Sequence, residues 1–355
     1  MNINQRKKIA IIGIQGVPSK YGGFETLVEH LIEDDSAEFT VFCSSIDQKQ
    51  SLKKYKNAFL KYIPLKANGI QSIPYDIIAL TRSLRGYDSI LVLGISGASF
   101  LPFYRLLSKS KVVVNIDGLE HSRQKRGKLT RRYWKWAEKI AVYNSDLIIA
   151  DNKAIQQYIL REYGKKSALV TYGGDQVLVP VSDPDISSVL SKYNLSKGDY
   201  AVAVCRIEPE NNCHIILEAF KLTRKNIVFV GNWQRSDYAR NLKAQYANEP
   251  NITLLDSIYD LKELFVLRSN ANCYLHGHSA GGTNPSLVEA MFFDVPIIAF
   301  DVVYNRETTF GTANYFSDVN DLVRMLNEEL KINSPRLAWE NYTWNKIRKD
   351  YLNRL

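Results

Sequence analysis

Long apolar runs, paired cysteines and low-complexity segments are all missing from this sequence of 355 residues. No run of about 18 apolar residues occurs, so we expect no membrane-spanning helix. The apolar stretch that follows the basic N-terminal residues is too short for a signal peptide, so we expect none. The four cysteines lack CxxC spacing, which argues against a cysteine-bound metal and fits a reducing cytosol: Cys43, Cys205, Cys213 and Cys273.

Acidic residues are outnumbered by basic ones, 37 to 46, which gives a formal net charge of +9. A positive balance favours an anionic partner, such as a nucleotide, a nucleic acid or an acidic lipid surface. A hydrophobic content of 45% is typical of a globular protein. The length predicts two domains, because single cores rarely grow that large.

Short apolar runs alternate with helical stretches along most of the chain. Runs without polar alternation are typical of parallel strands buried on both faces. We expect such strands at residues 8–12, 39–43, 89–94, 111–117, 146–151, 200–207, 226–231, 252–255, 272–277 and 295–300. The pattern predicts an α/β protein with two doubly wound, Rossmann-like domains that face a cleft. We place them at residues 1–172 and 199–334, with a linker at 173–198 and an amphipathic C-terminal helix at 335–355.

Glycine-rich or polar loops follow several of these strands, where open α/β sheets bind ligands. Gly22 and Gly23 lie in the loop after the first strand, where their small size would let a ligand approach the backbone. The loop does not have GxGxxG spacing, which weakens the case for a dinucleotide-dependent dehydrogenase. Asp117 ends a later strand. The alternative roles of its carboxylate are to bind a substrate hydroxyl, to act as a base, or only to cap the segment that follows.

The second half of the chain carries two further loops of this kind. Arg206 lies at the end of the strand expected at 200–207, and a guanidinium there suits a diphosphate, unless it pairs with Glu208 or Glu210. Gly281 to Asn284 precede a helix whose first N–H groups and hydroxyls would receive phosphates. Glu289, about a turn and a half into that helix, would accept a neutral sugar hydroxyl, because a carboxylate repels a diphosphate.

A basic segment with interspersed aromatics lies between His121 and Trp136 and contains no acidic residue up to Lys135. Basic and aromatic residues together favour an anionic membrane surface. A nucleic-acid surface and a solvated helix with core-facing aromatics are the alternatives, and no nucleic-acid motif accompanies the segment. The residues predicted to meet the membrane or a membrane-bound acceptor are Arg123, Lys125, Arg126, Lys128, Arg131, Arg132 and Trp134.

Three motifs together carry a resemblance that spans nearly the whole chain: YGGFE, RIEPENN and GGTNPSLVEAM. The sequence resembles retaining GT-B glycosyltransferases of family 4, and within them the bacterial rhamnosyltransferases that build cell-surface polysaccharide such as O-antigen or capsule. The resemblance implies transfer of L-rhamnose from dTDP-β-L-rhamnose to a saccharide on undecaprenyl diphosphate. It implies no cofactor, no catalytic metal and a peripheral location on the cytoplasmic face of the inner membrane. The first domain would bind the acceptor, and the second the donor.

The resemblance also implies roles for single residues. Arg206 would hold the donor diphosphate as the main catalytic group, and Asp117 falls where many relatives carry a histidine that contacts the transferred sugar. The C-terminal helix would pack back on the first domain. The donor-binding residues would be Gly22, Gly23, Arg206, Asn211, Ile258 at the base, Thr283, Asn284, Ser286, Leu287 and Glu289 at the nucleotide's sugar.

Two positions depart from the family pattern. Asn211 stands where a diphosphate-binding lysine is common, and Gly281 stands where an earlier glutamate often reads the transferred sugar. These departures leave room for other functions. The alternatives are a UDP- or GDP-linked donor, a sugar-nucleotide epimerase and a non-catalytic nucleotide- or glycan-binding protein; a nucleic-acid binder is the least favoured.

Overall fold

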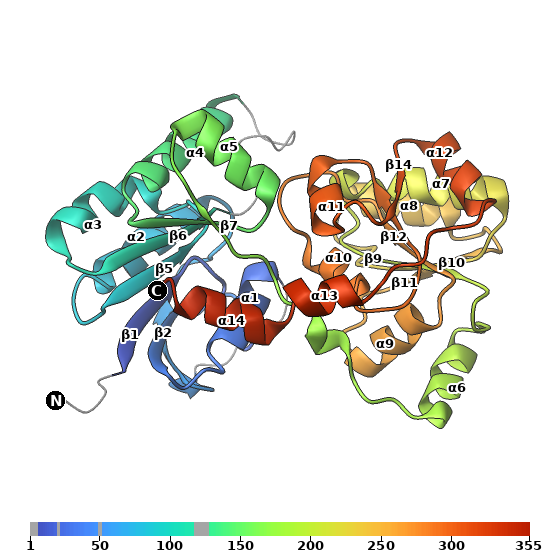
Figure 1. Cartoon of the computed structure of the whole chain (residues 1–355), viewed down its shortest axis with the longest axis horizontal. Coiled ribbons are helices and arrows are strands. Elements are labelled where there is room, and N and C mark those ends of the chain that lie inside the picture. Colours follow the sequence, from blue (N-terminus) through green and yellow to red (C-terminus); the bar gives the residue numbers. More distant parts are fainter. Residues whose placement is uncertain (1–5, 20–21, 49–51, 117–127) are drawn as a thin grey trace. The chain divides into compact units, whose positions relative to one another are not determined.

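The computed structural model describes residues 6–19, 22–48, 52–116 and 128–355, and it divides the chain into two compact units. Unit 1 comprises Met1–Tyr172 with Asn345–Leu355, and unit 2 comprises Gly173–Trp344. Each unit is a mostly parallel sheet with helices on both faces (Figure 1). The predicted α/β architecture of two doubly wound domains is therefore confirmed at the level of the fold.

Unit 1 contains an eight-stranded sheet in the order β3-β4-β2-β1-β5-β6-β7-β8. Its strands are β1 (Lys7–Ile12), β2 (Ala37–Ser44), β3 (Lys54–Tyr55), β4 (Ala58–Ile63), β5 (Ser89–Leu93), β6 (Lys111–Ile116), β7 (Leu147–Ala150) and β8 (Ala168–Leu169). All neighbours are parallel except β3 and β4, and in the centre Ile9 of β1 pairs with Ser89 of β5. Expectation and structure agree for the buried central strands, whereas the edge strands β3 and β8, and β4 next to β3, were not predicted from the sequence pattern.

The helices of unit 1 form two layers. They are α1 (Gly23–Leu31), α2 (Ser72–Arg82), α3 (Leu101–Leu107), α4 (Lys128–Tyr143), α5 (Lys153–Tyr163) and α14 (Trp344–Leu352), with 3₁₀ turns η1 (Gly69–Gln71) and η2 (Ala98–Phe100). Right-handed crossovers place α2 to α5 on one face of the sheet and α1 on the other (Figure 1). Local signals set their ends: Asn152 caps α5 by accepting the Ala154 N–H, and Gly164 ends it in the left-handed region.

Helix α14 brings the end of the chain back to unit 1. The Tyr351 hydroxyl accepts a 2.5 Å hydrogen bond from Asn115 Nδ2, and Arg348 pairs with Glu33 at 2.8 Å. Tyr351 and Ile347 are both buried. The expected single helix over 335–355 is in fact two helices, since α13 (Arg336–Asn341) ends before Tyr342 and belongs to unit 2.

Unit 2 contains a six-stranded parallel sheet in the order β11-β10-β9-β12-β13-β14. Its strands are β9 (Ala201–Val204), β10 (Ile227–Val230), β11 (Ile252–Leu255), β12 (Cys273–His276), β13 (Ile297–Phe300) and β14 (Asn314–Phe316). The remaining helices are α6 (Asp183–Lys192), α7 (Cys213–Thr223), α8 (Asp237–Tyr246), α9 (Leu261–Ser269), α10 (Pro285–Ala290), α11 (Val303–Thr308) and α12 (Val319–Leu326), with 3₁₀ turns η4 (Asp175–Val177) and η5 (Pro209–Asn211).

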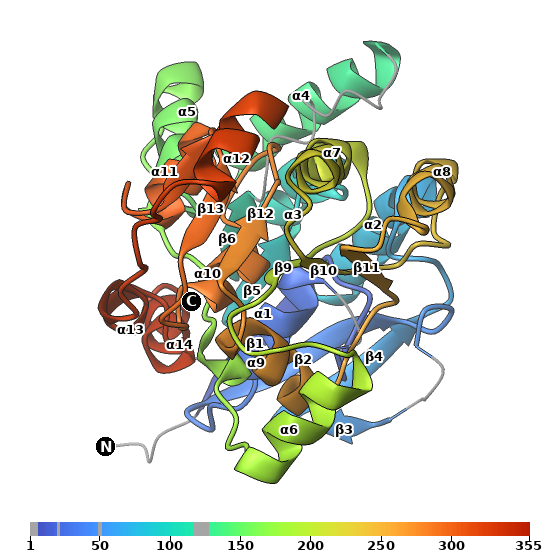
Figure 2. The same cartoon turned by 90° about the vertical axis from the view of Figure 1, so that its right-hand side faces the viewer.

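Two hydrophobic clusters cover the two faces of this second sheet. One joins the strands to α9, α10 and α13, and the other joins them to α7, α8 and α12. Figure 2 shows α7, α8 and α12 on the opposite side of this sheet from α9. The segment expected as a linker, 173–198, lies within unit 2, where α6 packs on α9. Ser182 and Asp185 begin α6 with a reciprocal capping box, so the Asp-Pro-Asp sequence there is a helix start. No helix in the described part of the chain is long and apolar enough to cross a membrane.

Candidate functional site

The carboxyl ends of β9 and β12 bring the predicted diphosphate residues to one edge of the unit 2 sheet. These strands are parallel neighbours, with Leu275 opposite Ala203, so the loops that follow them lie side by side. Arg206 comes two residues after β9, and its side chain is partly exposed. Within the described residues, no carboxylate pairs with its guanidinium, and the alternative of an ion pair with Glu208 or Glu210 is not seen. The guanidinium is therefore available to an anionic ligand.

Hydrogen bonds brace the loop that carries Arg206. Asn211 Nδ2 donates to the Arg206 carbonyl at 2.6 Å, and Asn211 Oδ1 lies 2.6 Å from His278 Nδ1 in the β12 loop. Ser279 donates to the carbonyl of Glu210 through both its N–H and its hydroxyl. Asn211 was predicted to contact the donor, but it is buried and both ends of its amide are used internally. Its observed contacts position Arg206, and contact with a donor stays a prediction.

The N–H groups at the start of α10 have more hydrogen-bond partners within the protein than the sequence indicated. Asn284 Oδ1 accepts the Ser286 N–H at 3.0 Å and the Ser286 hydroxyl at 2.8 Å, and the Asn284 carbonyl accepts the Leu287 N–H. The helix has only six residues, so its dipole is smaller than that of a long helix. Gly281 and Gly282 adopt positive φ angles of 32° and 77° just before it. Phosphate contacts through Ser286 and Leu287 would have to compete with this cap.

Thr283 is buried between these glycines and the cap. A donor-binding role for Thr283 stays a prediction.

Glu289 of α10 has two partners that sequence reasoning missed. Its Oε2 accepts a 2.6 Å charge-assisted bond from Arg268 of α9, and its Oε1 accepts a 2.9 Å bond from Gln176 of η4. Gln176 Oε1 in turn accepts the indole N–H of Trp344 at 2.6 Å. Arg268 is 3% exposed and Glu289 is 19% exposed, so the pair is buried on the arginine side and open on the carboxylate side. No residue spacing in the sequence predicts this contact, because only the tertiary structure brings α9 and α10 together.

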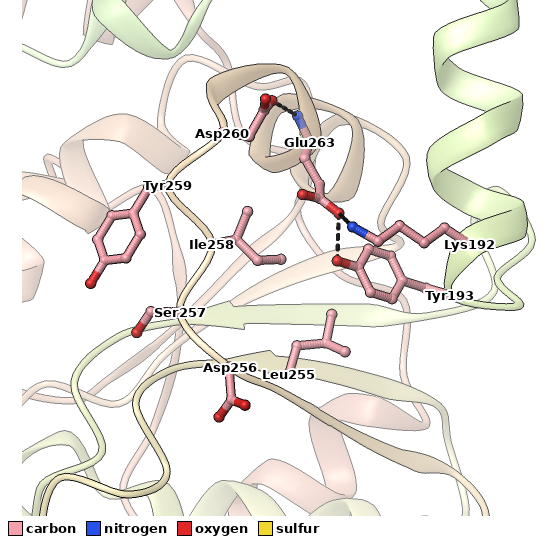
Figure 3. Close-up of a pocket in the computed structure, with 9 residues that line it drawn as sticks. All are labelled: Lys192, Tyr193, Leu255, Asp256, Ser257, Ile258, Tyr259, Asp260 and Glu263. Carbon is pink, nitrogen blue, oxygen red and sulfur yellow. Dashed lines mark hydrogen bonds and ion pairs between the residues drawn. The ribbon is translucent and has the colours of Figure 1, made fainter.

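Ile258, the residue predicted to lie at the base, lines a pocket of about 480 Å³ beyond the end of β11 (Figure 3). The pocket is formed by Lys192, Tyr193, Leu255, Asp256, Ser257, Ile258, Tyr259, Asp260 and Glu263. On one wall, Glu263 accepts a 2.5 Å bond from Lys192 and a short one from the Tyr193 hydroxyl (Figure 3). Tyr259 is 68% exposed, which leaves an aromatic face open to a planar ligand.

A buried histidine lies next to the Arg206 loop. His276 ends β12, and its Nε2 has no hydrogen-bond partner among the described residues. Burial, together with the nearby His278, lowers the pKa of His276 well below its usual range, so the ring is neutral at neutral pH. It stacks against Tyr274 with ring centroids 6.4 Å apart. Sequence reasoning passed over this residue, since a histidine within an apolar strand pattern carries no distinctive signal.

In unit 1, Gly22 and Gly23 lie at the start of α1, after the loop that follows β1. Gly22 is the N-cap residue, with φ of 122°, and a Cβ there would lie 2.0 Å from Glu25 Oε2. The buried Glu25 accepts the Gln15 N–H at 2.9 Å, so its carboxylate braces the loop. The positive φ favours glycine at position 22 whether or not a ligand is present, and ligand contact stays a prediction.

Another carboxylate of unit 1 is buried behind the turn that follows β5. Asp76 of α2 is 2% exposed, Gly97 donates its N–H to it, and its Oδ1 has no partner among the described residues. Burial raises the pKa of Asp76 to about 8, so the neutral acid predominates at neutral pH.

The predicted catalytic residue Asp117 lies outside the described residues, and so does part of the predicted membrane segment, namely Arg123, Lys125, Arg126 and the side chain of Lys128. Arg131 and Arg132 are exposed on α4. Lys135 is not a free cation, because it pairs with Glu162 at 2.9 Å and with the buried Glu138 at 3.7 Å.

The choice of Trp134 as a membrane residue is wrong, since it is buried at 8% exposure. Trp136, two residues further along, is 49% exposed. Positions two apart lie on different sides of a helix, and here the ring of Trp134 faces the core while that of Trp136 faces solvent.

The comparisons with known proteins follow the division of the chain. Residues 6–175 match a family model described as Domain of unknown function (DUF1972), and residues 190–343 match the model for Glycosyl transferases group 1. No curated protein matches the sequence significantly.

Several solved structures share the whole fold. Sucrose-phosphate synthase from Thermosynechococcus elongatus is 18% identical, with a TM-score of 0.82 over 98% of each chain. Anabaena HepE in complex with UDP-glucose is 15% identical, with a TM-score of 0.74 over 98% of this chain and all of that one (100%). An α,α-trehalose-phosphate synthase (UDP-forming) from Burkholderia xenovorans is 12% identical, with a TM-score of 0.73 over 98% and 99% of the two chains. The chain thus has the GT-B glycosyltransferase fold, and its second half is a group 1 glycosyl transferase domain.

Proposed function

We propose that the protein is a retaining family 4 glycosyltransferase that transfers L-rhamnose from dTDP-β-L-rhamnose to a saccharide on a lipid diphosphate. It acts in cell-surface polysaccharide synthesis, at the cytoplasmic face of the inner membrane. The observation that carries the proposal is the guanidinium of Arg206, which has no ion-pair partner among the described residues. It lies on a braced loop at the carboxyl edge of a group 1 glycosyl transferase domain.

The chemistry follows from where charge develops. As the glycosidic bond breaks, negative charge grows on the leaving diphosphate, and a fixed cation stabilises that charge more in the transition state than in the ground state. Asn211 and His278 hold the Arg206 loop in place, so little reorganisation is needed. The leaving phosphate itself takes the proton of the attacking acceptor hydroxyl, so no carboxylate nucleophile is required. Asp117 would meet the transferred sugar.

The nucleotide would lie along the same edge of unit 2. Glu289 would accept a ribose hydroxyl with a lone pair that Arg268 and Gln176 leave unused, since a carboxylate has about four acceptor positions. Ile258 and the pocket beside it would receive the base, with Tyr259 as a stacking surface. Because position 281 is glycine where relatives often have glutamate, no carboxylate from this position would contact the transferred sugar, which is compatible with a deoxy sugar.

Replacing Arg206 tests the assignment directly. We expect Arg206→Ala to lower turnover about 10²–10³-fold, the usual loss when one such donor is removed. The assay follows transfer of radiolabelled rhamnose from dTDP-rhamnose to a lipid-diphosphate saccharide. Unchanged thermal unfolding would show that the fold is intact, because Arg206 is partly exposed.

Arg240→Ala provides the matched control. Arg240 is an exposed arginine of α8 that pairs with Asp237 in the same unit. Near-normal transfer by Arg206→Ala, or an equal loss in Arg240→Ala, would refute the assigned diphosphate site.

A UDP-linked donor is the strongest alternative, because the structure of HepE with UDP-glucose shares the fold. A GDP-linked donor, an epimerase and a non-catalytic binding protein remain as further alternatives. Product analysis separates a transferase from the last two: a transferase yields a glycosylated lipid, an epimerase yields altered or free sugar nucleotide, and a binding protein yields no product.

A further inference from the structure

Helix α3 exposes an unusual number of large apolar side chains for its length. Leu101 and Tyr104 of this helix are buried against the rest of unit 1. By contrast, Phe103 is 59% exposed, Leu106 is 83% exposed and Leu107 is 63% exposed. Single exposed leucines are common on protein surfaces, but three large apolar side chains in seven residues form a contiguous patch. The charge on this helix is neutralised locally, since Arg105 pairs with Asp146.

Helix α4 packs against α3 (Figure 1). It adds cations and aromatic side chains. Arg132, Trp136, Lys139 and Tyr143 are all exposed and are spaced at i, i+4, i+7 and i+11, so they form one stripe along the helix. The acid of α4, Glu138, is 1% exposed and is held by Tyr158 and Tyr163, so it contributes no negative charge to this stripe. The stripe therefore alternates cations with the aromatic rings that favour a membrane interface.

We propose that α3 and the exposed stripe of α4 form a docking surface for an anionic lipid bilayer. Phe103, Leu106 and Leu107 enter the boundary between headgroups and acyl chains, while Arg132 and Lys139 lie at the lipid phosphates. The inference deepens the proposed function and rests on it, because a lipid-linked acceptor is reached at a bilayer. It also shifts the apolar part of the contact from the sequence-predicted Trp134 to α3.

Charge complementarity favours a bilayer over a second copy of the chain. A symmetric pair would place the same patch on both sides of the interface, so both sides would carry Arg132 and Lys139. Like charges brought together in this way oppose association. An anionic bilayer presents the opposite charge and an apolar interior together.

The test is co-sedimentation of the full chain with phosphatidylcholine vesicles, with and without phosphatidylglycerol, at low and at physiological salt. We expect the triple variant Phe103→Ser/Leu106→Ser/Leu107→Ser to have a partition coefficient onto phosphatidylglycerol vesicles that is lower by roughly ten-fold or more, because its apolar anchors are gone. The matched control Leu222→Ser/Val303→Ser/Ile332→Ser removes three apolar side chains of unit 2 that are similarly exposed, and it should bind as the unchanged protein does.

A charge variant separates the two parts of the surface. Arg132→Gln/Lys139→Gln should lose the preference for phosphatidylglycerol and most of the salt dependence, since screening acts on these cations. Thermal unfolding of every variant should match that of the unchanged protein, because the substituted side chains are exposed.

Two readouts keep this inference separate from the proposed function. Transfer to a short-chain, water-soluble acceptor should be unaffected in the triple variant, whereas transfer to acceptor in vesicles should fall. Unchanged vesicle binding by the triple variant would overturn the docking surface, whatever the activity. A dimer that the triple substitution converts to a monomer, with vesicle binding unchanged, would overturn it in favour of a second copy. Loss of activity in Arg206→Ala is independent of both.

Discussion

Single residues at the carboxyl edge of unit 2 divide into those open to a ligand and those that hold others in place. Arg206 has no ion-pair partner within the described residues, whereas Asn211 uses its whole amide on the Arg206 carbonyl and on His278. Glu289 stands between these roles, because Arg268 and Gln176 fix its carboxylate and still leave it 19% exposed. Sequence motifs select Arg206, Asn211 and Glu289 together and do not distinguish the two roles.

The Arg268–Glu289 pair should be energetically coupled. A buried arginine left without its carboxylate is costly, so we expect Arg268→Met and Glu289→Gln to couple by about 1–3 kcal/mol. The measurement is a double-mutant cycle by urea unfolding. The exposed pair Arg324–Asp321, taken through the same cycle, should couple by about 0.5 kcal/mol or less. Additive effects at Arg268 and Glu289 would contradict the contact.

At the scale of elements, the cap of a helix and its rotation about its axis decide which groups it leaves open to a ligand. Helix α10 begins with an asparagine cap that occupies the N–H groups predicted to hold phosphate, and α4 turns Trp134 inward and Trp136 outward. Helix α2 presents Asp76 to the turn after β5, where a Cβ on Gly97 would lie 2.5 Å from the Asp76 Cβ. This close approach seals the carboxyl from water.

The seal makes stability of unit 1 depend on pH. The pKa of Asp76 is about 8 in the folded state against 3.8 as its ordinary value, so the unfolded chain releases a proton that the folded chain keeps. Stability from this group is full below about pH 4 and is lost as the pH rises toward 8, by at most about 1.4 kcal/mol per pH unit.

Substituting the carboxyl should remove that slope. Asp76→Asn keeps an acceptor for the Gly97 N–H and cannot ionise, so its stability relative to the unchanged protein should rise between pH 5 and pH 8. Urea midpoints of unit 1 across this range provide the measurement. A constant difference between the two proteins would show that Asp76 is ionised in the folded state.

At the scale of the whole molecule, the chain end belongs to the unit in which the chain began. Ile347, Tyr351 and Leu355 are each no more than 2% exposed within unit 1. The C-terminal helix that we expected on the first domain therefore corresponds to α14, whereas α13 belongs to unit 2.

This placement predicts where a C-terminal substitution acts. Ile347→Ala should destabilise unit 1 by about 2–5 kcal/mol, because it leaves a cavity in a buried position. Hydrogen exchange should show faster opening of β1 and β5 and unchanged protection of β9 and β12. Lys346→Ala, at an exposed neighbouring position, should change neither unit. Loss of protection confined to unit 2 would contradict the assignment.

The alternation of apolar strands and helices by itself determined the α/β class, the two-domain organisation and the positions of most central strands. These features depend on burial along a local stretch of chain, which leaves a periodic signal in the sequence. Edge strands such as β3, β8 and β14 were missed, because they are two or three residues long. Tertiary structure alone decided that Arg268 holds Glu289, that Asn211 braces Arg206 and that α3 is exposed. The contacts of Arg268 with Glu289 and of Asn211 with His278 join residues 21 and 67 positions apart in the chain, and nothing in their local sequence depends on the partner.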